Sequence, residues 1–218
     1  YNSLGDGTMK KALLLYGLNC TEAIWQPLLN NMQELKTDIL TYPHEVTASA
    51  FEVMDLTKWV WPKVKDKHYD VIIAHSMGGV IALQLAVMGI DCQHLILIET
   101  NLRPANPFYR NLMTAEHMME YDEIKLMLKQ ESAYASNELI ASLQDEFDYT
   151  PLIHNLKQRI DIIYGDRNVP DYPERITDLC LDHQTINKLN FHFIADSCHL
   201  PMIENPRGLA ECIKMLII

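Results

Sequence analysis

Short apolar runs recur along this chain, and each ends in a turn of small or polar residues. The runs lie near residues 10–16, 38–42, 71–74, 94–99, 160–164 and 189–195. Runs of this length that are rich in Leu, Ile and Val are typical of strands buried on both faces, as in a parallel sheet. The pattern therefore predicts about six strands in one mainly parallel sheet.

Helical spacing separates most of these runs. Thr21 can cap a helix whose apolar positions extend from Ile24 to Leu35. After a loop at 43–47, a second helix is expected from residue 49 or 50 to about 67, with Phe51 facing inward. Other helices are expected to end at residue 88 and to occupy 206–218. Alternating strands and helices predict right-handed crossovers and an α/β fold with helices flanking the sheet.

The stretch 101–156 breaks this alternation because it contains no candidate strand. It shows only helical patterns, near 109–119, 122–130 and 137–147. An insertion after the fourth strand lies at the carboxyl edge of the sheet, where α/β proteins bind ligands. We therefore expect a small helical cap within a single domain, residues 9–218. Residues 1–8 read as an added leader ahead of a native start at Met9.

The most informative motif lies in Asp70–Leu83, where an apolar run meets a second apolar segment at Ser76. Ala74 and Gly78 flank the serine two positions away on either side, and Gly79 follows. A serine on a sharp strand-to-helix turn needs such small neighbours, and this pattern is typical of a nucleophile elbow. The alternative is an ordinary glycine-containing turn between a strand and a helix.

A nucleophilic serine needs a base and an oxyanion hole. His199 follows the last predicted strand, which places it at the same sheet edge as Ser76, so we expect it to be the base. His75 is expected to pack beneath the elbow. The backbone amides of Met77 and of Leu18, in the loop after the first strand, are the expected oxyanion donors.

The acid that should orient the histidine is harder to place. Two carboxylates, Asp166 and Asp171, follow the fifth predicted strand, and Asn168 lies between them. Asp166 is our first candidate. Asp171 is interpreted as the N-cap of a following helix, and Glu99, after the fourth strand, is a more distant candidate.

Composition narrows the function classes. The 218-residue chain has a formal net charge of −11, which argues against a nucleic-acid or polybasic membrane contact. The five cysteines lack metal-ligand spacing and are expected to be reduced, in a cytoplasmic protein. Residues 71–90 are nearly long enough for a membrane span, but His75, Ser76 and Gln84 favour a buried strand and helix. We expect no cofactor and no metal.

Together, these motifs resemble the α/β-hydrolase superfamily. They are Tyr16-Gly17-Leu18 with Trp25, the run Ala-His-Ser-Met-Gly-Gly at 74–79, the run Tyr-Gly-Asp-Arg-Asn at 164–168, and 198–206. The resemblance implies an eight-stranded sheet, here without its first two strands, with Ser76 as nucleophile, His199 as base, and Leu18 and Met77 as oxyanion donors. It is closest in character to small carboxylesterases and thioesterases, including the pimeloyl-carrier-protein methyl esterase type. Two positions depart from the family. Tyr16 replaces the usual histidine before the glycine, and Asn168 occupies the position of the acid in the family's Gly-x-x-Asp pattern, counted from Gly165. The spacing from Asp166 to Pro170 equals the one commonly seen after the family's acid, which supports Asp166.

These observations favour a serine hydrolase that cleaves an ester or thioester of a small or acyl-type substrate through an acyl-Ser76 intermediate. Methionines in the cap, with Phe108 and Leu126, suggest an apolar pocket. Arg103 and Arg110 could hold a carboxylate or an acidic acyl-carrier partner. Two alternatives stay open: a degenerate hydrolase fold that binds a ligand or partner without turnover, and lyase or C–C hydrolase chemistry on the same scaffold.

Overall fold

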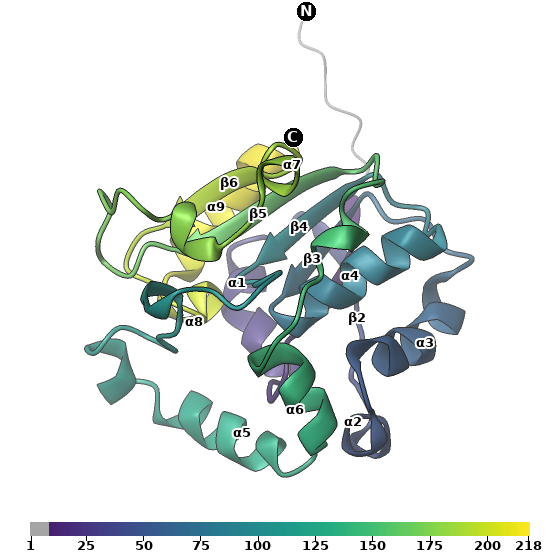
Figure 1. The fold of residues 1–218 in the computed structure, drawn as a ribbon, viewed down its shortest axis with the longest axis horizontal. Coiled ribbons are helices and arrows are strands. Elements are labelled where there is room, and N and C mark those ends of the chain that lie inside the picture. Colours follow the sequence, from purple (N-terminus) through teal and green to yellow (C-terminus); the bar gives the residue numbers. More distant parts are fainter. Residues whose placement is uncertain (1–8) are drawn as a thin grey trace, which may run out of the picture.

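The computed structural model describes residues 9–218; the expected leader, residues 1–8, lies outside the described residues. It contains one sheet of six parallel strands in the order β2-β1-β3-β4-β5-β6 (Figure 1). The strands are β1 (Lys10–Leu15), β2 (Leu35–Ile39), β3 (Val71–His75), β4 (His94–Ile98), β5 (Arg159–Gly165) and β6 (Asn190–Ile194). The expected α/β fold with about six strands is therefore confirmed.

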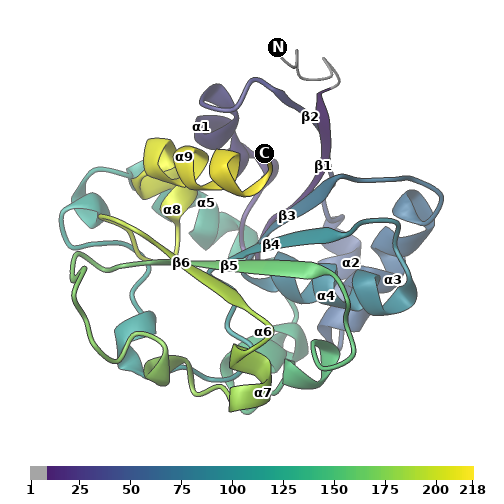
Figure 2. The ribbon, with the colours of Figure 1, turned by 90° about the horizontal axis from the view of Figure 1, so that it is seen from above.

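Helices cover both faces of this sheet (Figure 2). Helix α1 (Gln26–Asn30), α8 (Pro201–Glu204) and α9 (Pro206–Leu216) lie on one face, and α3 (Val53–Val64) and α4 (Met77–Met88) on the other. The remaining helices are α2 (His44–Ser49), α5 (Asp122–Ser132), α6 (Asn137–Gln144) and α7 (His183–Ile186). Short 3₁₀ helices are η1 (Glu22–Trp25), η2 (Pro107–Tyr109), η3 (His117–Met119), η4 (Thr150–Leu152) and η5 (Thr177–Leu179).

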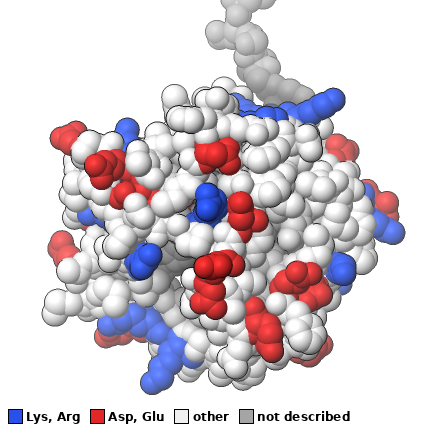
Figure 3. All heavy atoms as spheres, in the orientation of Figure 1, with Lys and Arg blue, Asp and Glu red and all other residues white. Residues whose placement is uncertain are grey.

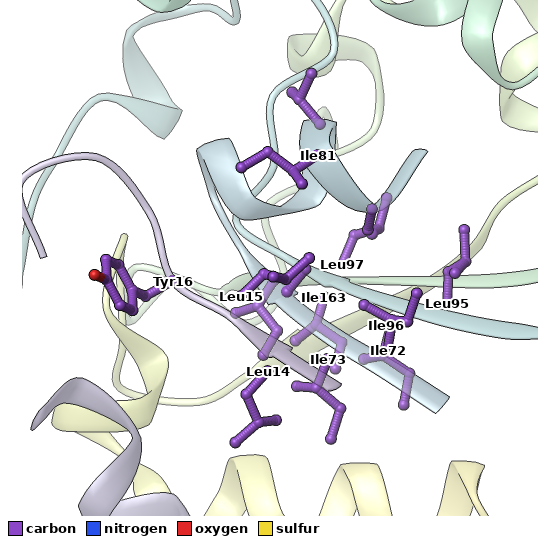
Figure 4. Close-up of a cluster of buried hydrophobic side chains, with 14 of the residues drawn as sticks. Leu14, Leu15, Tyr16, Ile72, Ile73, Ile81, Leu95, Ile96, Leu97 and Ile163 are labelled. Atoms are coloured by element: carbon purple, nitrogen blue, oxygen red, sulfur yellow. The ribbon is translucent and has the colours of Figure 1, made fainter. Parts of the chain in front are cut away.

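The core lies between the central strands and their helices (Figure 4). Ile73 of β3 pairs in register with Leu14 of β1 and Ile96 of β4, and all three side chains are fully buried. Helix α4 is buried from Met77 through Ala86, which explains its almost continuous apolar sequence. None of the helices in residues 9–218 is long and apolar enough to cross a membrane.

Several sequence predictions of local structure were wrong. The helix expected to extend to Leu35 ends at Asn30, because Leu35 begins β2. The loop expected at 43–47 and the helix after it are instead α2 and α3, separated by a short break in which Phe51 is 73% exposed. A capping box at Glu52 and Asp55 starts α3 anew, and this signal explains the break.

The connection from β4 to β5, residues 99–158, is helical and contains no strand among its residues, all of which are described. It holds α5 and α6, as expected, whereas the helix expected at 109–119 is reduced to η2 and η3. No helix starts at Asp171, where an N-cap was expected. The description of 9–218 as one domain with a cap at 101–156 stays a prediction.

Candidate active site

Ser76 lies at the sharp turn between β3 and α4. Its φ of 52° and ψ of −119° are unfavourable for an L-residue and are typical of a strained elbow. The turn is fixed by the Ser76 amide, which donates to Ile98 O at 2.9 Å, and by Thr100 Oγ1, which donates to Ser76 O at 3.0 Å. A side chain at Gly78 would collide with the Leu15 carbonyl of β1, so a residue without Cβ is needed there.

The loop after β1 approaches the elbow closely. A Cβ at Gly17 would lie 2.9 Å from Ser76 Cβ and 3.0 Å from His75 Nδ1. This contact places the next residue, Leu18, in the wall of the cavity that Ser76 and Met77 also line. The Met77 amide belongs to the first turn of α4 and has no acceptor within the helix. The structure thus brings both expected oxyanion residues to the serine.

His199 reaches the same cavity from the loop after β6. Its Nδ1 lies 3.3 Å from Oε1 of Glu99, which follows β4 directly. A carboxylate only accepts hydrogen bonds, so Nδ1 is the donor in this contact, which leaves Nε2 as the ring nitrogen that faces away from Glu99. No hydrogen bond joins Ser76 Oγ to His199 in residues 9–218, and such contacts in unliganded hydrolases often form only with substrate.

The structure places Asp166 away from the histidine. Its Oδ1 accepts the amides of Asn168 at 2.8 Å and Asp196 at 3.1 Å, and so joins the loops that follow β5 and β6. Within the described residues Asp166 has no hydrogen bond or ion pair to His199. Asn168, which occupies the usual acid position, has a φ of 62° and only a backbone bond to this carboxylate. The carboxylate in contact with His199 is that of Glu99.

Glu99 is 1% exposed and is held by a buried cation. Arg167 Nη1 donates to Oε2 at 2.6 Å and Nη2 donates to Oε1 at 2.7 Å, in a two-pronged ion pair. The amide of Gly165 donates to Oε2 at 2.8 Å. Burial alone would raise the pKa of Glu99, but the charge and hydrogen bonds of Arg167, with His199, outweigh it and the pKa is lowered. The carboxylate is therefore ionised where it contacts His199.

His75 packs against the loop that carries His199. Its Nε2 lies 2.8 Å from the backbone oxygen of His199, to which it can only donate. Burial, helped by nearby His199, lowers the pKa of His75 to about 3. The neutral ring therefore holds the His199 backbone in place, in agreement with the expectation that it packs beneath the elbow.

A cavity of about 600 Å³ joins these residues. Ser76, Glu99 and His199 line one part, and Leu112, Leu128, Leu143 and Phe147 line the β4–β5 side. Four carboxamides also face it, namely Asn19, Asn101, Asn111 and Gln144.

The prediction that the cap methionines line the substrate pocket is wrong. None of Met113, Met118, Met119 and Met127 lines the cavity, nor do Phe108 and Leu126. Met119 is 83% exposed and Leu126 is 54% exposed. Of the two expected arginines, Arg110 lines the cavity with its guanidinium on Ala105 O, whereas exposed Arg103 donates to Cys180 O.

Glu99 and Arg167 are the two residues of the site that the sequence predicts least well. The sequence favours Asp166 over Glu99 as the acid, and it predicts no role for Arg167. The available signal was a charged residue at the end of an otherwise apolar strand, because an ionised side chain there needs a partner or a function. No cluster of three His, Cys, Asp or Glu residues in 9–218 is arranged to hold a metal ion.

Comparison with solved structures decides the fold. An enol-lactonase from Burkholderia xenovorans LB400 superposes with a TM-score of 0.70 at 16% identity, covering 95% of this chain and 91% of that one. A thioesterase domain from the curacin biosynthetic pathway gives 0.68 at 15% identity, covering 97% and 93%. The chain has the α/β-hydrolase fold. An esterase from Thermogutta terrifontis, solved with malate bound, gives 0.64 at 19% identity, covering 97% and 90%.

These identities are low, so the likeness concerns the α/β-hydrolase fold and not a substrate. No protein-family model matches the chain, and no curated protein sequence matches it significantly. The sequence resemblance to this superfamily is confirmed at the level of the fold. The six strands also agree with the expectation of a smaller sheet than the eight-stranded form.

Proposed function

We propose that this protein is a serine hydrolase that cleaves a carboxylic ester or thioester through an acyl-Ser76 intermediate. One observation carries the proposal: a serine at a strained elbow shares a cavity with a histidine whose Nδ1 contacts a buried, ionised carboxylate. Nucleophile, base and orienting acid are the groups that acyl transfer requires. The low-identity neighbours, which include an esterase, a thioesterase and a lactonase, agree with this chemistry.

In acylation, Ser76 Oγ attacks the substrate carbonyl while His199 Nε2 takes the hydroxyl proton. Glu99, which accepts from Nδ1, stabilises the imidazolium that forms. The amides of Leu18 and Met77 donate to the oxyanion of the tetrahedral intermediate. Collapse breaks the bond to the leaving alcohol or thiol, which departs with the proton from His199 and leaves an ester on Ser76.

Deacylation repeats these steps with water. His199 removes a proton from water, the hydroxide attacks the acyl carbonyl, and Ser76 leaves with that proton. The net reaction is one ester and one water converted to one acid and one alcohol or thiol.

The cavity supports a substrate that is part apolar and part polar. Its leucines and Phe147 suit an acyl or alcohol chain, whereas the side-chain oxygens of Asn19 and Asn101 are buried with no hydrogen-bond partner among residues 9–218. An unpaired buried acceptor costs free energy that a donor on the substrate would recover. We therefore expect hydroxyl- or amide-bearing acyl groups to react faster than plain alkyl chains of equal length, as a panel of p-nitrophenyl esters would measure.

Labelling with a fluorophosphonate probe tests the reaction class. The native protein should be labelled once, at Ser76, and Ser76→Ala should be neither labelled nor active on short p-nitrophenyl esters. Mass spectrometry of the labelled peptide identifies the site. A folded native protein that stays unlabelled between pH 6 and 9 would overturn the proposal.

A matched pair of variants identifies the acid. Glu99→Gln should lower kcat by about 10³ to 10⁴-fold, because it cannot stabilise the imidazolium. Asp166→Asn removes a carboxylate that contacts only backbone amides, and it should retain kcat within about tenfold. The reverse ranking would return the role of acid to Asp166.

The contact between Glu99 and His199 removes the main reason for a degenerate fold, which was the asparagine at position 168. No observation favours lyase or C–C hydrolase chemistry over ester cleavage. A substrate panel that varies the leaving group would distinguish them.

A further inference from the structure

Arg167 does not line the cavity itself, but it hydrogen-bonds to two lining residues, Glu99 and Tyr109, and its side chain is only 3% exposed. Its guanidinium reaches past Gly165 O, which it contacts at 2.9 Å, to grip both carboxylate oxygens of Glu99. Two parallel N–H···O bonds fix the plane of a carboxylate as well as its position.

The plane of this carboxylate matters because its oxygens have different partners. Oε2 receives Arg167 Nη1 and the Gly165 amide, whereas Oε1 receives Arg167 Nη2 at 2.7 Å and His199 Nδ1 at 3.3 Å. The arginine bonds are the shorter ones, so they determine where Oε1 lies. His199 is therefore oriented by the Glu99 carboxylate, whose own position is fixed by Arg167.

We propose that Arg167 is a positioning residue of this site, which acts through Glu99 by aiming Oε1 at His199 and keeping the carboxylate charged. The proposal rests on the proposed function. Arg167 does not touch the reacting atoms, and its effect on the rate passes entirely through the acid.

Within residues 9–218, Glu99 has ion-pair contact with Arg167 and His199 alone, whereas Arg110, which lines the same cavity, donates to Ala105 O. His75 of β3 is neutral, and Tyr109 of η2, Tyr164 of β5 and Cys198 beside His199 are uncharged, with pKa values that burial raises. His199 is the base itself. Without Arg167, burial of Glu99 is opposed only by His199 and the Gly165 amide, so protonation of the carboxyl moves to higher pH.

The test compares Arg167→Met, Arg167→Lys and Arg175→Met on a short p-nitrophenyl ester. Arg175 is the matched control: its guanidinium lies over the ring of Phe193 at 4.2 Å, as that of Arg167 lies over Tyr109 at 4.8 Å. Within the described residues, however, Arg175 has no carboxylate in ion-pair contact.

We expect Arg167→Met to lower kcat about 10 to 100-fold with little change in KM, and to move the acidic limb of the pH–rate profile upward. Arg167→Lys should restore the limb, since it keeps the charge, but only part of kcat, since an ammonium lacks the planar fork. Arg175→Met should match the native protein in both.

A double variant guards against a simple folding defect. In the Glu99→Gln background, Arg167→Met should cause no further loss of kcat, because the residue through which it acts is already disabled. An additive loss, or an Arg167→Met protein that is folded by circular dichroism with an unchanged kcat and pH profile, overturns the proposal. Failure of fluorophosphonate to label the native protein would instead overturn the hydrolase function on which it rests.

Discussion

Gly17 lies so close to the elbow that there is no room for a side chain between it and Ser76. Because Gly17 has no Cβ, the loop after β1 can lie against Ser76. The position of the Leu18 amide therefore depends on glycine at position 17.

Gly17→Ala tests that dependence. The added Cβ would come within 2.9 Å of Ser76 Cβ, so the loop must move and carry the Leu18 amide with it. Loss of one oxyanion donor costs about 10² to 10³ in kcat, and we expect a loss of that order with a smaller change in KM. Leu18→Ala, which trims the side chain but leaves the amide, should lose far less. Equal losses would show that the side chain, not the amide, is what matters there.

At this scale the sequence predicted well what depends on local pattern. Ser76 and its small neighbours lie within six consecutive residues, so the elbow could be recognised directly. Glu99 could not be preferred over Asp166 in the same way. Whether Glu99 or Asp166 is the acid depends on which carboxylate contacts His199, and the three residues follow different strands, β4, β5 and β6. It also depends on Arg167 pointing inward to Glu99. Neither contact can be predicted from the spacing of residues along the chain.

Among elements, the loop after β6 is tied to the β4–β5 connection by one buried side chain. Glu204 of α8 accepts the amides of Cys198 at 2.6 Å and Thr114 at 2.7 Å, and it also contacts His117 Nδ1 at 3.1 Å. The amide of His199 itself donates to Leu112 O at 3.0 Å. The loop that carries His199 is thus bonded to Leu112, which lines the cavity.

His117 makes this tie sensitive to pH. Burial lowers its pKa, but Glu204, Asp196 and Glu120 outweigh burial and the pKa is raised, with the Tyr121 ring also packed against it. A group whose pKa is higher in the folded state stabilises fully below its unfolded value of about 6.5 and loses that contribution as pH rises through the folded value. Stability should therefore decline above neutral pH.

The measurement is the melting temperature between pH 6 and 8.5 for the native protein, His117→Ala and His183→Ala. His117→Ala should melt lower at pH 6 and show a flatter pH dependence, whereas exposed His183→Ala should follow the native curve. A His117→Ala curve parallel to the native one would contradict the assignment.

Element boundaries were predicted less well than element types. All six strands were placed to within a few residues, because buried parallel strands are continuous apolar runs. The prediction of a helix at 109–119 is wrong because the hydrophobic residues of this segment lie in short 3₁₀ turns and not on one face of a helix. Tyr109 packs on the Arg167 guanidinium and His117 meets Glu204, contacts with distant segments that helical periodicity does not encode.

Acidic and basic side chains are both spread over the face shown in Figure 3. This distribution agrees with the net charge of −11. The acidic acyl-carrier partner stays a prediction.

All five cysteines are free thiols, and their reactivity should report the integrity of the whole fold. Cys20, Cys92 and Cys198 are buried, which raises their pKa values to about 12, 11 and 12. In the native protein at pH 8, Ellman's reagent should react fastest with half-buried Cys180 and more slowly with Cys212, whose pKa burial also raises, and after unfolding with all five. Fewer than five thiols in the unfolded protein would reveal a disulfide.

Strands β3, β4, β5 and β6, which lie next to one another in the sheet, are each followed by a residue in the left-handed backbone region. Within two residues of β3, β4, β5 and β6 stand Ser76, Glu99, Arg167 and Asp196, with φ between 50° and 55°. Each of these backbones would be relaxed by glycine, by about 1 kcal/mol or more. Glycine is absent from all four positions, so the contacts of these side chains offset a backbone cost of that order. Ser76→Gly, which removes that cost at the elbow, should melt higher than Ser76→Ala.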